Sequence, residues 1–163
     1  MKKQLAPLAS ISLLIFSSAI HAQNSPQELV RQIYLALGTP ASQSDYQITT
    51  MISPTYRDRY FTPEIVALFE INDTYGDDLI FGCVPIPLIL SGNDFMADEI
   101  HRTLALDTQT QGNRQVVEAR FTNFGEPNHY RYEYEEQQGH WKIADIAAVG
   151  SWQLSHIDCE PAR

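Results

Sequence analysis

The stretch that decides the fold is HYRYEYEEQQGHWKIADI, residues 129–146. Every second residue from Tyr130 to Tyr134 is a tyrosine, and the residues between them are charged. Side chains of a β-strand point alternately to its two faces, so this pattern predicts a strand with one aromatic and one charged face. A turn that ends at Gly139 leads into a further strand that carries Trp141. The stretch therefore predicts an antiparallel pair of strands.

Two more strands are predicted upstream of this pair. Val117, Ala119 and Phe121 alternate with polar residues between turn sequences at residues 111–113 and 125–128. A preceding strand is predicted from alternate residues that share one face: Ile100, Arg102, Leu104 and Leu106. Four consecutive strands joined by short turns predict an antiparallel meander.

The chain before these strands has a helical period. Ser25 and Glu28 form the Ser-x-x-Glu pattern of a helix start, and Pro26 suits the first helical position. Apolar residues then recur at helical spacing, and Gly38 is expected to end the helix.

The remaining elements complete an α+β prediction. Further helices are predicted at residues 42–52 and 62–76, with a short helical turn at residues 152–157. Glycines and prolines predict a long, packed loop over residues 77–92. We therefore expect a single α+β domain, residues 23–163, with N-terminal helices packed on a curved four-stranded antiparallel meander.

Residues 1–22 have the pattern of a signal peptide. Lys2 and Lys3 precede a stretch without charge, and Ala22 fits the end of a small-residue cleavage site. The apolar part is shorter than the roughly 20 residues that a membrane-spanning helix needs. The pattern predicts export to the periplasm, with a soluble protein after cleavage.

The chain is acidic, with 11 Lys and Arg against 20 Asp and Glu and a formal net charge of −9. Loss of Lys2 and Lys3 with the leader would take this charge to −11 and leave Lys142 as the only lysine. Such a charge repels phosphate backbones and anionic lipids, so neither nucleic acid nor a membrane surface is expected as a partner. We expect a cationic periplasmic protein; the alternative is that the acidity only keeps an exported protein soluble.

Cys83 and Cys159 are the two cysteines of the chain. Disulfides persist outside the cytoplasm, so export predicts that these two residues form one. The bond would tie the C-terminal tail to the loop at residues 77–92.

Several segments come in an order known from one bacterial family: Asn93-Asp94-Phe95, Glu118-Ala119-Arg120-Phe121, the tyrosine strand, and Gly139-His140-Trp141-Lys142-Ile143-Ala144-Asp145-Ile146. Over residues 29–157 the chain resembles the bacterial domain-of-unknown-function family 3828, exported proteins similar to the cystatin-like or nuclear-transport-factor-two-like cone fold. The resemblance implies this fold, export and a wall-side function. It supplies no catalytic residues.

Acidic residues gather on both sides of the predicted loop. Asp77 and Asp78 lie at its start, and Asp94 and Asp98 follow its end. They lack the Asp-x-Asp-x-Asp-Gly ladder of a calcium loop, so no metal is expected. Because charge complementarity selects oppositely charged partners, these four residues are the predicted partner-binding site; the alternative is a solvated rim.

Three histidines lie on different predicted strands: His101, His129 and His140. Strand alternation predicts that the first two face solvent. A histidine cluster across the sheet is the alternative, although no metal-ligand spacing accompanies it.

The aromatic face of the sheet is the candidate lining of a cavity. In a cone fold this face could orient a small ligand or transfer a proton. The predicted cavity residues are Arg102, Tyr130, Tyr132, Tyr134, Trp141 and Asp145. The alternative is an aromatic core whose hydroxyl groups reach its rim.

The sequence contains no recognisable catalytic motif. Ser151 follows a glycine but lacks the Gly-x-Ser-x-Gly elbow, and no cofactor is expected. Our first hypothesis is therefore an exported, non-enzymatic binding protein, an inhibitor or immunity protein against a basic wall-degrading or toxic enzyme. A small-molecule-binding or isomerase-like enzyme using Tyr132, Arg102 and Asp145 is the second, and envelope maintenance is the third. The oligomeric state stays open.

Overall fold

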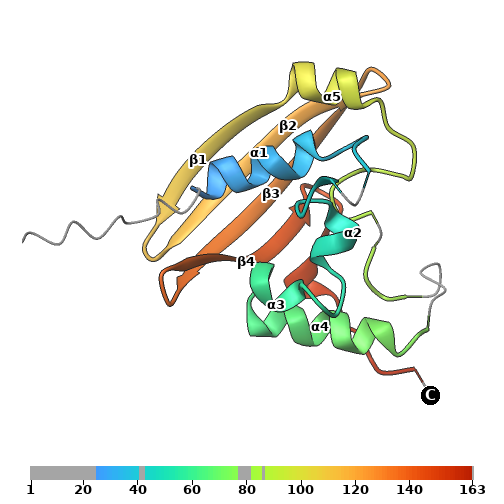
Figure 1. Ribbon diagram of the computed structural model, residues 1–163, viewed down its shortest axis with the longest axis vertical. Helices are drawn as coiled ribbons and strands as arrows, with labels where there is room; N and C mark the ends of the chain where they lie inside the picture. Colours follow the sequence, from blue (N-terminus) through green and yellow to red (C-terminus); the bar gives the residue numbers. More distant parts are fainter. Residues whose placement is uncertain (1–24, 41–42, 77–81, 86, 163) are drawn as a thin grey trace, which may run out of the picture.

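The computed structural model describes residues 25–40, 43–76, 82–85 and 87–162. The predicted leader, together with Asp77 and Asp78, lies outside the described residues. Within them the chain forms an α+β fold, in which helices cover an antiparallel sheet (Figure 1). None of the described helices is long and apolar enough to cross a bilayer.

Helix α1 (Pro26–Leu35) begins where the sequence predicts. The Ser25 hydroxyl accepts a hydrogen bond from the Glu28 backbone N–H at 3.3 Å, and Pro26 occupies the first turn. Val30, Ile33 and Tyr34 are buried, so the helix turns one apolar face to the sheet. The chain leaves it through Gly38, whose φ of 80° favours glycine.

Helix α1 is followed in the described part of the chain by α2 (Ile48–Met51), α3 (Arg57–Tyr60) and α4 (Pro63–Asp73). The predicted helix over residues 42–52 is confirmed only in its last turn. Before it, the Ser44 hydroxyl accepts a hydrogen bond from the Tyr46 N–H at 3.2 Å, a local turn that competes with helix. Helix α4 matches its prediction.

Over the residues that the structure describes, the sheet has five antiparallel strands in the order β1-β2-β3-β4-β5. The predicted meander is therefore confirmed with one additional, short strand. The strands are β1 (Ala105–Gln111), β2 (Arg114–Asn123), β3 (Glu126–Gln137), β4 (His140–Ala148) and β5 (Trp152–Gln153). The predicted C-terminal helical turn is a 3-10 turn at Leu154–His156, directly after β5.

The predicted start of the first strand is wrong. Residues Ala97–Thr103 form helix α5, and β1 begins only at Ala105. Acids occupy the first turn of α5 and basic residues its last turn, which suits the helix dipole. Ile100 is buried, and the Thr103 hydroxyl donates a hydrogen bond to the Glu99 carbonyl at 2.8 Å. The apparent alternation from Ile100 onward therefore spans a helix and the strand that follows it.

The main core lies between α1 and the aromatic face of the sheet. The Tyr132 hydroxyl donates a hydrogen bond to the Tyr34 hydroxyl at 3.0 Å, and the Tyr34 ring lies 4.9 Å from the Phe121 ring. Figure 1 shows α1 crossing the sheet, with α5 at one end and α2, α3 and α4 beside β4. The outer edge of β4 is also covered at Ile143, whose carbonyl accepts a hydrogen bond from the Thr62 N–H at 3.0 Å.

The predicted disulfide is present between Cys83 and Cys159, with their Cα atoms 5.7 Å apart. The described parts of the predicted loop are packed, because Val84, Leu88, Ile89 and Leu90 are buried. The C-terminal tail lies beside α4 (Figure 1), where the Ala162 N–H donates to the Thr74 hydroxyl at 2.8 Å.

Replacing both cysteines by serine should destabilise the fold. The bond closes a separation of 76 residues, and the entropy of the unfolded chain predicts a loss of ~4 kcal/mol. Urea unfolding of the oxidised wild type and the Cys83→Ser/Cys159→Ser variant measures this loss. Equal unfolding midpoints for the two proteins would contradict the prediction.

Candidate functional site

Asp94 and Asp98, two of the four acidic residues predicted for partner binding, belong to the described part of the chain and lie at one end of the sheet. Asp94 is in the loop before α5, and Asp98 is in the first turn of that helix. Both are exposed. The turn between β2 and β3 reaches the same end, so that α5 and this turn lie side by side (Figure 1).

Three exposed apolar side chains accompany these acids, and the sequence-based prediction missed them. Phe95, Met96 and Phe124 are 38%, 49% and 57% exposed. We call the aromatic–acidic surface the set formed by Asp94, Phe95, Met96, Asp98, Phe124 and Glu126. The sequence contained a signal for Phe124 only. This aromatic residue precedes Gly125 at a hairpin turn, where asparagine or aspartate is the usual residue.

The buried side chain of Asn123 connects the two halves of this surface. Its Oδ1 atom accepts a hydrogen bond from the Met96 N–H at 2.9 Å, and its Nδ2 atom donates to the Asp94 carbonyl at 3.1 Å. One amide thus fixes the loop before α5 against the β2–β3 turn. A surface held in this way loses little conformational freedom when a partner binds.

The turn itself holds Phe124 in an unfavourable backbone conformation. Asn123 pairs with Glu126, so that Phe124 and Gly125 form a two-residue turn, with φ angles of 54° and 78°. Positive φ at both positions is typical of a type I′ turn, which favours Asn-Gly. A bulky residue in this region costs about 1 kcal/mol or more. Because the Phe124 side chain is exposed, core packing does not explain its presence.

Glu99 attaches this turn to α5. Its Oε1 atom accepts hydrogen bonds from the Thr122 hydroxyl at 3.0 Å and the Gly125 N–H at 3.1 Å. Burial raises the pKa of Glu99, but these hydrogen bonds outweigh it and lower the pKa below its ordinary value of 4.5. The folded state therefore favours the carboxylate.

The attachment should weaken in acid. A lowered folded pKa contributes stability above the unfolded pKa, and this contribution disappears as the pH falls through the folded value. The thermal midpoint of Glu99→Gln should therefore lie below that of wild type at neutral pH, and the two should converge in acid. Thermal unfolding across the acidic range measures this, and a difference independent of pH would contradict it.

The six residues predicted to line one cavity do not all come together. Tyr130, Tyr132 and Tyr134 are buried, and burial raises the pKa of all three hydroxyls, so they stay neutral in the core. Arg102 is exposed on α5. The alternative of an aromatic core describes the central part of this set.

Asp145 lies apart from the tyrosines, on the opposite face of the sheet. It pairs with Glu133, on the strand face opposite to Tyr132 and Tyr134, next to a register shift in the β3–β4 ladder. Its carboxylate accepts hydrogen bonds from the Gln153 side chain at 2.6 Å and the Ser155 N–H at 3.2 Å. These bonds fix the turn after β5.

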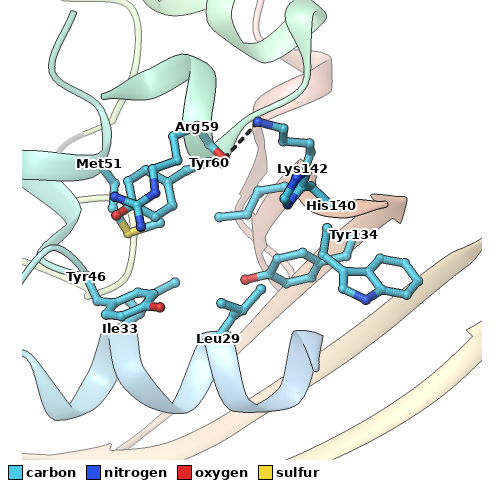
Figure 2. A pocket seen from close by; sticks show the side chains of 11 residues that line it. Leu29, Ile33, Tyr46, Met51, Arg59, Tyr60, Tyr134, His140 and Lys142 are labelled. Carbon is cyan, nitrogen blue, oxygen red and sulfur yellow. Dashed lines mark hydrogen bonds between the residues drawn. The ribbon is translucent and has the colours of Figure 1, made fainter. Parts of the chain in front are cut away.

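Tyr134 and Trp141 line a pocket at the other end of β3 (Figure 2). The pocket has a volume of about 380 Å³, within the size range of small-molecule sites. Residues of α1, α2, α3 and β4 complete its wall.

The three histidines occupy separate environments. His101 lies on α5, half-buried rather than facing solvent, with its Nε2 atom 3.0 Å from the Tyr34 carbonyl. His129 on β3 is also half-buried and bonded to Glu118, whereas His140 is exposed at the start of β4. Among the residues that the structure describes, no group of three potential ligands is placed to hold a metal ion.

The fold belongs to a class of proteins in which helices pack on one antiparallel meander. No protein-family model matches the chain, and no curated protein is similar in sequence. Membership of the domain-of-unknown-function family 3828 stays a prediction.

A solved structure shares this fold. The chain is similar to a chain in the crystal structure of the type VI native effector–immunity complex Tae3–Tai3 from Ralstonia pickettii. The TM-score is 0.55 at 19% sequence identity, and the match covers 80% of this chain and 99% of that chain.

Proposed function

We propose that this protein is an exported immunity or inhibitor protein that binds a basic toxic or wall-degrading enzyme in the periplasm. The shared fold with a chain of an effector–immunity complex supports a protein partner. The acidic composition and the signal-peptide pattern support a cationic partner and an extracytoplasmic location. The disulfide between Cys83 and Cys159 fits an oxidising compartment.

The aromatic–acidic surface is the contact that we propose. Aromatic residues and methionine are enriched in protein interfaces, and buried aromatic anchors supply much of the binding energy. Acidic residues around them, such as Asp94 and Asp98, accelerate association with a basic partner and exclude acidic ones. The surface thus combines exposed apolar side chains with exposed acidic ones.

The observation that carries this proposal is Phe124. Its positive φ angle costs stability, and its side chain is 57% exposed, so the free protein gains little from it. Phe124 lowers the stability of the fold and adds nothing to the core. Its presence is explained if a partner protein buries its side chain on binding. Phe95 and Met96 belong to the segment that Asn123 fixes to the β2–β3 turn, and they add exposed apolar area at the same end of the sheet.

Phe124→Asn should separate stability from binding. Asparagine suits a type I′ turn, so the free energy of unfolding should rise by about 1 kcal/mol. Loss of an aromatic anchor should weaken binding of the enzyme about tenfold or more. Chemical denaturation and surface plasmon resonance measure the two effects.

The chain supplies a matched control at the β3–β4 turn. Gln138 also has a φ of 54° and is followed by a glycine. Gln138→Asn should raise stability similarly without changing affinity. If Phe124→Asn binds the enzyme as tightly as wild type does, the proposed contact is wrong.

The function itself is tested by neutralisation. Candidate basic enzymes from the periplasm or encoded beside the gene are expressed in the periplasm with and without this protein. Protection of the cells, lost in Phe124→Asn and reduced in Asp94→Asn/Asp98→Asn, is the expected result. If no basic enzyme binds at low ionic strength, the proposed function fails.

A further inference from the structure

The pocket at the end of β3 has an apolar wall and a basic mouth. Leu29 and Ile33 of α1 and Met51 of α2 supply apolar surface, and Figure 2 shows Tyr134 reaching across from the sheet toward them. Arg59 and Lys142 lie across the pocket from α1. Apolar surface joined to a few convergent polar groups is typical of small-molecule sites.

The charge of this pocket is opposite to that of the chain. None of the described residues that line it is Asp or Glu, although the chain has 20 acids against 11 basic residues. Asp45, outside the lining, is 3.6 Å from the Arg59 guanidinium, but both side chains are largely exposed, so water screens this pair. The mouth therefore keeps a local positive charge.

Lys142 is held at the mouth by backbone groups. Its Nζ atom donates hydrogen bonds to the Asp58 carbonyl and, at 2.8 Å, to the Arg59 carbonyl. An ammonium group has three donors, so one is left for a further acceptor. Burial lowers the pKa of Lys142, with Asp58 raising it and Arg59 lowering it further. An anion beside the ammonium would offset this burial.

Two buried hydroxyl groups in the pocket wall add a second, independent observation. The hydroxyls of Tyr60 and Tyr134 have no hydrogen-bond partner among the described residues. Tyr134 is 1% exposed and Tyr60 is 9% exposed. Buried polar groups are normally paired, and leaving one unpaired is unfavourable. A ligand oxygen in the pocket would supply the partner.

We propose that this pocket binds a small apolar or aromatic molecule that carries one carboxylate. The carboxylate would accept hydrogen bonds from Lys142 and a tyrosine hydroxyl, while the apolar part packs on the surface of α1 and α2. A single anionic group suits the site because the Lys142 ammonium has one donor left for a further acceptor. The aromatic–acidic surface lies at the other end of β3, so this site is independent of the proposed function.

The test uses cinnamate and its neutral isostere cinnamamide as probes of the oxidised, full-length mature protein. Titration calorimetry should give a dissociation constant for cinnamate about tenfold lower than for cinnamamide, because one charge-assisted hydrogen bond distinguishes them. Lys142→Gln should abolish this preference. Arg102→Gln, which removes an exposed cation on α5, should keep it.

Tyr134→Phe should change stability and affinity in opposite directions. It removes an unpartnered buried hydroxyl, so the thermal midpoint of the free protein should rise while the affinity for cinnamate falls severalfold. In nitrogen-15 NMR spectra the indole N–H signal of Trp141 should shift on addition of cinnamate, and that of Trp152 should not.

Three results would overturn the proposal. They are equal affinities for the two probes, the absence of cinnamate binding at millimolar concentration, and an unchanged preference in Lys142→Gln. If Lys142→Gln does not fold, Tyr134→Phe and the Trp141 signal decide the question.

Discussion

The hydrogen bond between the Tyr34 and Tyr132 hydroxyls joins α1 to the sheet in the centre of the core. Burial raises the pKa of both phenols, so the pair stays neutral and needs no counter-ion. The Tyr34 carbonyl lies 3.0 Å from the His101 imidazole, so α5 is fixed to α1 at the same place. Helices α1 and α5 are both packed on the sheet. The proposed contacts lie at the two ends of the sheet: the aromatic–acidic surface at one end and the basic pocket at the other.

Much of the fold follows from local pattern. The meander was predictable because β2 and β3 keep a period of two over most of their length. Helices α1 and α4 were predictable because proline marks the start of each and apolar residues recur along it. The short elements were not predictable, since α5 and β5 contain too few residues for a period to show. They form because long-range contacts hold them, as the buried Ile100 does for α5.

The candidate site was predictable only in its charge. Asp94 and Asp98 were found because acids accumulate visibly in the sequence. Phe124 was missed because its significance depends on a backbone angle, and the basic pocket was missed because Arg59 and Lys142 are far apart in the chain. Alternation correctly placed Tyr132 and Tyr134 on one face, but it could not indicate that α1 fills the space above Tyr132.

The disulfide closes a covalent ring over residues 83–159, which includes α5 and every strand. Cutting any one peptide bond inside such a ring leaves the two pieces joined. A protease that nicked the exposed turn at Phe124 would therefore remove the proposed contact while the protein kept its apparent size on a non-reducing gel. Intact size without reductant is thus no guarantee of an intact binding surface, and only the reduced sample reveals the nick.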